Sequence, residues 1–71
     1  MSTILIFVFK DSNQVKVIYK QGNSPKEELE EYPNSVLETK GGQVQIWNQD
    51  PTVSSDPVLV VPTSRTIIKY V

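Results

Sequence analysis

The segment TILIFVFK, residues 3–10, is apolar at every position from Ile4 to Phe9. Because the side chains of a β-strand alternate between its two faces, such a strand presents apolar side chains on both sides. A strand of this kind is normally buried between two layers of structure. The segment therefore needs a cover on each side, and this need restricts what the chain can fold into.

The chain is so short that two apolar faces are difficult to cover. Its 71 residues predict a single domain, residues 1–71, and a domain of about 60 residues buries only roughly 60% of the surface of its unfolded chain. Small proteins often gain stability from disulfides, metals or partners. Because the chain has no cysteine and no histidine, a disulfide framework and the usual zinc or copper ligands are excluded. We expect no metal and no cofactor, and a partner as the remaining support.

A first antiparallel hairpin is predicted over residues 3–10 and 15–20, joined by the turn-forming residues DSNQ. We expect Lys10 to lie opposite Val15. By strand alternation, the core face then carries Ile4, Ile6, Val8, Val15, Val17 and Tyr19. The second face carries Leu5, Phe7, Phe9 and Ile18 beside Lys16 and Lys20.

The segment SPKEELEEYP, residues 24–33, has the pattern of a helix start. Ser24 is a candidate N-cap, Pro25 suits the first helical position and Glu27 is placed to complete a capping box. Because Pro33 disfavours helix at the preceding residue, we expect one short helix of about two turns after the second strand. Such a helix has little apolar surface with which to cover a sheet.

Two further hairpins are predicted. In VLETKGGQVQIWN, residues 36–48, two glycines supply the positive φ angles of a tight turn, which places Val36 opposite Trp47 and Leu37 opposite Ile46. The segment VLVVPTSRTIIKYV, residues 58–71, predicts a third hairpin that turns at residues 62–65. The expected fold is mainly β, of the α+β class, with three antiparallel hairpins forming a small sheet or barrel and one short helix.

This order of strand, strand, helix, strand, strand, strand resembles the β-grasp arrangement of ubiquitin-like domains. In that arrangement the first and last strands lie side by side in parallel. The resemblance is one of element order and length, and the chain ends in Lys69, Tyr70 and Val71 where a ubiquitin-like modifier ends in two glycines. A β-grasp-like architecture is therefore an alternative to three hairpins, and no family is assigned.

Charge and hydropathy indicate which environments and partners the sequence favours. The formal net charge of -1 implies neither a strong nucleic-acid-binding field nor an acidic tail. The apolar run is shorter than the roughly 20 residues of a membrane span. It also lacks the preceding basic residue and the following cleavage site of a signal peptide. We expect a soluble cytoplasmic protein that does not enter a membrane.

Catalytic signatures are weak. Histidine, the most common general acid or base, is absent. Four glutamates lie between residues 27 and 31, but a run of this kind is typical of a solvated helix face. A nucleophilic serine would need a lysine base, and Ser24 near Lys26 has no supporting pattern. We expect that the protein is not an enzyme.

The second face of the first hairpin suggests a function. Left uncovered, it would form an apolar patch of several hundred Å², the scale of binding sites. The alternative is that the third hairpin folds over this face within one chain. We expect a small non-catalytic binding or accessory protein that acts through protein–protein contacts, as a homodimer, a higher oligomer or with another protein. The predicted interface residues are Phe7, Phe9, Ile18 and Trp47, with Lys16 and Lys20 at the rim.

Two other functions are open. A single-stranded nucleic acid would use the same face, with Phe7 and Phe9 stacking on bases and Lys10, Lys16 and Lys20 pairing with phosphates. Against this function, the chain has one arginine and little net charge. The third possibility is a small inhibitor of a larger enzyme, which would be monomeric in isolation.

Overall fold

The computed structural model describes residues 2–22, 27–50, 52 and 56–71. Within these residues the chain forms strands and two 3-10 helices of three residues each. The strands are β1 (Ser2–Phe9), β2 (Gln14–Gln21), β3 (Glu27–Tyr32), β4 (Ser35–Lys40), β5 (Gln43–Asn48), β6 (Leu59–Pro62) and β7 (Thr66–Tyr70). The short helices are η1 (Lys10–Ser12) and η2 (Thr63–Arg65). The predicted mainly β class is confirmed.

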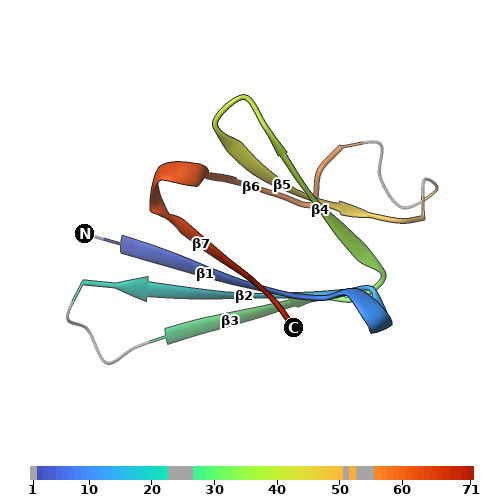
Figure 1. The fold of residues 1–71 in the computed structure, drawn as a ribbon, viewed down its shortest axis with the longest axis horizontal. Helices are drawn as coiled ribbons and strands as arrows, with labels where there is room; N and C mark the ends of the chain where they lie inside the picture. The colour runs from blue at the N-terminus through green and yellow to red at the C-terminus, as the bar shows by residue number, and fades with distance from the viewer. Residues whose placement is uncertain (1, 23–26, 51, 53–55) are drawn as a thin grey trace.

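The strands form two sheets that lie across one another as two layers (Figure 1). A four-stranded sheet has the order β3-β2-β1-β7, and a three-stranded sheet has the order β4-β5-β6. Neighbouring strands are antiparallel except β1 and β7, which run parallel. The parallel first and last strands match the β-grasp alternative, whereas the described residues do not form the helix of that arrangement, because β3 occupies most of its place.

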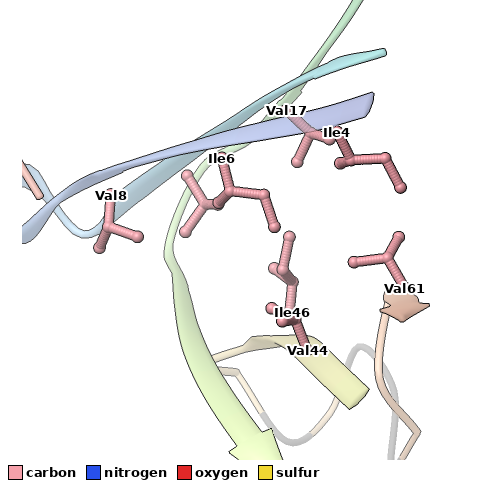
Figure 2. Packing of buried hydrophobic residues seen from close by; sticks show 8 residues of the cluster. Ile4, Ile6, Val8, Val17, Val44, Ile46 and Val61 are labelled. Carbon is pink, nitrogen blue, oxygen red and sulfur yellow. The ribbon is translucent and has the colours of Figure 1, made fainter. Parts of the chain in front are cut away.

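The core lies between the two sheets. Figure 2 shows Ile4, Ile6, Val8 and Val17 pointing from the four-stranded sheet toward Val44, Ile46 and Val61 of the three-stranded sheet. Ile6, Val17 and Ile46 are fully buried, at 0% exposure. Because β-branched side chains fit well on a pleated surface, this valine and isoleucine core also favours the strands that carry it.

The first hairpin has the predicted faces but a different register. Val8, not Lys10, lies opposite Val15. The turn has the expected four residues but begins one residue earlier, because η1 and Asn13, whose φ is 52°, lie between the strands and Gln14 already belongs to β2. A shift of two residues preserves the alternation of side chains, whereas a shift of one would have exchanged the faces.

The predicted short helix is wrong. Glu27–Tyr32 forms β3, which pairs antiparallel with β2, while Ser24 and Pro25 lie outside the described residues. Pairing places Glu31 opposite Lys16 and Leu29 opposite Ile18. Opposite charges and apolar pairs across a strand ladder stabilise a sheet, whereas a two-turn helix would have had little apolar surface to bury.

The second hairpin is confirmed in its register. Val36 lies opposite Trp47 and Leu37 opposite Ile46. Gly41 and Gly42 have φ angles of 58° and 75° at the turn, the left-handed conformation that the sequence required.

The predicted third hairpin is wrong. Its two strands belong to different sheets, because β6 pairs with β5 and β7 pairs with β1. The expected turn is instead the crossing between the sheets, where η2 is fixed to the β4–β5 turn. Both the backbone N–H and the hydroxyl of Thr63 donate to the Gly42 carbonyl, each at 3.0 Å.

Candidate functional site

The side of the four-stranded sheet that points away from the core is the outer face. Strand pairing and alternation place twelve described side chains on it: Thr3, Leu5, Phe7, Phe9, Gln14, Lys16, Ile18, Lys20, Leu29, Glu31, Ile67 and Lys69. All twelve are partly or fully exposed, and Leu29 and Ile67 are 57% and 49% exposed. Among the described residues, no strand or helix forms a layer over this face.

The position of the C-terminal strands explains why the outer face is open. The sequence left two possibilities, a third hairpin folded over this face or an uncovered face. β7 instead extends the same sheet at its edge, beside β1, and β6 joins the sheet on the other side of the core. The described elements therefore cover one side of β1 and leave the other side partly exposed.

An apolar row crosses the outer face from edge to edge. Ile18 lies opposite Leu29 on one side and Leu5 on the other, and Leu5 lies beside Ile67. Since neighbouring strands lie about 4.8 Å apart, this row is roughly 15 Å long. A continuous apolar row of this length differs from the scattered apolar side chains of an ordinary protein surface.

A charged row lies directly beside the apolar row. Its order is Glu31, Lys16, Phe7 and Lys69, from the β3 edge to the β7 edge. The Lys16 Nζ lies 3.7 Å from the Glu31 Oε1 and 5.3 Å from the centre of the Phe9 ring. The row is thus acidic at one edge of the sheet and basic at the other.

The structure brings together five of the six predicted interface residues. Phe7, Phe9, Lys16, Ile18 and Lys20 share the outer face. Trp47 does not, because it lies on the outward side of the three-stranded sheet, a surface that we call the Trp47 face.

The Trp47 face is open as well but more polar. Its other outward residues include Val36, Glu38, Lys40, Gln43, Gln45 and Val60. The Trp47 indole N–H donates to the Gln45 side-chain oxygen at 3.3 Å. Trp47 therefore lies against a neighbouring polar side chain of its own strand, beside Val36.

Lys10, predicted only for the nucleic-acid alternative, lies in η1 beyond the end of the outer face. Its Nζ is 4.6 Å from the centre of the Tyr70 ring, within the range of a cation–π contact. Both residues line an open groove of about 280 Å³ between the ends of the sheets. This volume is at the lower limit for small-molecule sites, which are usually about 300–1,000 Å³.

Sequence reasoning missed four residues of the outer face: Leu29, Glu31, Ile67 and Lys69. The local sequence pattern predicts a helix for the first two and a hairpin with residues 58–61 for the last two, whereas they lie on β3 and β7. One signal was available for β3, because Glu27 and Glu31 have the same four-residue spacing as Lys16 and Lys20 on β2. No comparable local signal identifies β1 as the neighbour of β7.

Two tyrosines and a glutamate meet at the border of the core. The Tyr32 hydroxyl donates to the Glu30 carboxylate, and the Tyr19 hydroxyl lies 3.4 Å from the same oxygen. Burial first, and then the hydrogen bond and charge of Glu30, raise the pKa of Tyr32. Burial and the Glu30 charge also raise the pKa of Tyr19. These groups link β2 to β3 and thereby position the acidic edge of the outer face.

Comparison with protein-family models, with curated proteins and with solved structures gave no match. Within the described ranges, no group of three or more side chains is arranged to hold a metal ion. No helix in the described part of the chain has the length and apolar character needed to cross a membrane.

Proposed function

We propose that the protein is a small non-catalytic binding protein that acts through protein–protein contacts at the outer face, and that it associates with a second copy of itself. The observation that carries this proposal is the apolar row, from Leu29 to Ile67, which crosses four strands and over which no described element forms a layer. A sheet with apolar side chains on both sides favours a layer on each side. A partner supplies the layer that the described part of one chain lacks.

The size of the outer face fits a reversible contact. From a spacing of about 4.8 Å between strands and about 3.3 Å per residue, the face measures roughly 20 by 25 Å. Two such faces enclose on the order of 1,000 Å², the lower limit of specific protein interfaces. We therefore expect association that depends on concentration in the micromolar range.

The charges of the outer face favour a protein partner over a nucleic acid. Lys16 is already paired with Glu31 and packs near the Phe9 ring. A phosphate backbone would have to compete with this carboxylate, and the acidic β3 edge would repel it. Leu5 and Ile18 in the centre of the face and Ile67 at its edge are also aliphatic, and aliphatic side chains cannot stack on bases as aromatic rings do.

The experiment is a measurement of solution mass over a concentration series, by sedimentation equilibrium, for the natural chain and two variants. Ile18→Glu places a charge in the centre of the apolar row, close to Lys16 and Lys20, which favour it within the single chain. Val60→Glu is the matched control, because Val60 is 45% exposed on the Trp47 face. We expect the natural chain and Val60→Glu to dimerise alike and Ile18→Glu to remain monomeric.

Three outcomes separate the possible functions. A natural chain that is monomeric at every concentration contradicts self-association, and a monomer that captures one larger enzyme would support the inhibitor hypothesis. Binding of single-stranded oligonucleotides that weakens steeply with salt would support the nucleic-acid alternative. Dimerisation through apolar contacts should instead persist or tighten as salt rises.

A further inference from the structure

We infer that the second copy docks on the outer face with a two-fold axis parallel to β1, so that the β3 edge of each copy lies over the β7 edge of the other. This inference rests on the proposed function and adds the geometry of the contact. A two-fold axis makes the interface self-complementary, so that each residue pair occurs twice. The direction of the axis then decides which residues meet.

With an axis parallel to the strands, each row of one copy lies over the same row of the partner. The order of the residues along the partner's row is reversed. The apolar row then lies on the partner's apolar row. Leu29 faces the partner's Ile67, and Ile18 faces the partner's Leu5. All contacts along the centre of the interface are therefore aliphatic, which is the composition expected of an interface core.

The same axis also pairs the charged rows favourably. Glu31, at the acidic edge, faces the partner's Lys69, at the basic edge. Lys16 faces the partner's Phe7, and by symmetry Phe7 faces the partner's Lys16. Two opposite-charge pairs therefore form at the rim, and both lysines at position 16 meet an aromatic ring.

A two-fold axis perpendicular to the strands brings unfavourable pairs of side chains together in the same two rows. If it passes over the charged row, Glu31 meets the partner's Glu31 and Lys16 meets the partner's Lys16. If it passes over the apolar row, Lys16 meets the partner's Lys20. If it lies between the two rows, Ile18 meets the partner's Lys16. Like charges or charge on aliphatic surface disfavour each of these arrangements, so only the parallel axis satisfies both rows.

Charge reversal tests this geometry. Glu31→Lys alone and Lys69→Glu alone each place like charges together twice in the dimer. We expect each to weaken dimerisation roughly tenfold relative to the natural chain. The double variant Glu31→Lys/Lys69→Glu restores opposite charges and should dimerise within about threefold of the natural chain. An equimolar mixture of the two single variants should form a heterodimer of similar strength.

The matched controls are Glu38→Lys and Lys40→Glu, which make the same charge changes on β4, on the Trp47 face, and should leave dimerisation unchanged. A Glu31→Lys chain that dimerises as tightly as the natural chain, or a double variant as weak as either single variant, would overturn the axis. If Ile18→Glu still abolishes association in that case, the proposed function stands and only the geometry is wrong. If the natural chain does not dimerise at all, the proposed function itself fails.

Discussion

The two faces of the β1–β2 hairpin both carry large apolar side chains but have different surroundings. On the inner face, Ile6, Val15 and Val17 are fully buried against the three-stranded sheet. On the outer face, Leu5 and Ile18 are only partly buried, although they lie on the same strands and in the same ladder. The difference in burial between these apolar residues arises from the layer that packs on the inner face.

This contrast assigns different roles to the two faces. Burial of the inner face stabilises the single chain, because apolar surface removed from water is the main favourable term in folding. The apolar surface that stays exposed on the outer face is removed from water only when a partner binds. Substitutions on the two faces should therefore separate folding from association.

The largest effect is expected on the inner face. Ile6→Ala removes buried methyl and methylene groups from the centre of the core and should lower the free energy of unfolding by about 2–5 kcal/mol. Urea denaturation, followed by the fluorescence of Trp47 at a concentration where the chain is monomeric, would measure it. A loss below about 1 kcal/mol would contradict the assignment of this face to the core.

The second-largest effect is expected at Leu5, which precedes Ile6 in the sequence and lies on the outer face. Leu5→Ala should weaken dimerisation about tenfold, because two copies of Leu5 lie near the centre of the interface. The unfolding of the monomer should change by less than half as much as in Ile6→Ala, since Leu5 is partly exposed in the single chain. Equal effects of both substitutions on monomer unfolding, with no change in association, would remove the distinction between the faces.

The two faces themselves were predictable from the sequence, because they depend only on alternation. The register of the first hairpin was wrong by two residues, yet every side chain kept its face. The second hairpin was correct because Gly41 and Gly42 fix its turn locally. Periodicity thus sufficed for the faces of the first hairpin, and turn chemistry sufficed for the register of the second.

The neighbours of the remaining strands were not predictable from local patterns. The helix-start pattern near Ser24 and Pro25 competes with the pairing of Glu31 and Leu29 to β2, which a local window does not include. Similarly, nothing within residues 58–71 indicates that β7 leaves β6 and pairs with β1. Both errors concern pairing with a strand outside the segment that carries the local pattern, and for this reason half of the apolar row was missed.

A smaller effect is expected at the border between the two faces. Tyr32→Phe removes the hydroxyl that donates to Glu30 and should cost about 1 kcal/mol of unfolding free energy at neutral pH. The raised pKa of Tyr32 in the folded chain means that the unfolded chain loses the tyrosine proton first as pH rises above about 10. The contribution of Tyr32 is therefore complete below that pH and is lost above it.

The alkaline stability profile measures this contribution. Thermal unfolding of the natural chain and Tyr32→Phe should differ at neutral pH and converge as pH rises beyond about 10. Tyr70→Phe is the control. Because Tyr70 is 60% exposed, we expect this substitution to change thermal unfolding little at neutral or at alkaline pH. A difference between the two chains that is independent of pH would contradict the link to tyrosine ionisation.

The smallest effect on folding is expected for the charge in the middle of the outer face. Lys16 and Glu31 form an ion pair between exposed groups, with side-chain exposures of 38% and 62%, and such pairs contribute only about 0–1 kcal/mol. Lys16→Ala should therefore change monomer unfolding by less than about 1 kcal/mol, while it removes the contact with the partner's Phe7 and weakens dimerisation severalfold. Chemical denaturation of a dilute sample and sedimentation of a concentrated one measure the two quantities. A Lys16→Ala chain that is strongly destabilised as a monomer would show that Lys16 supports the fold, and the outer face would then stabilise the single chain as the inner face does.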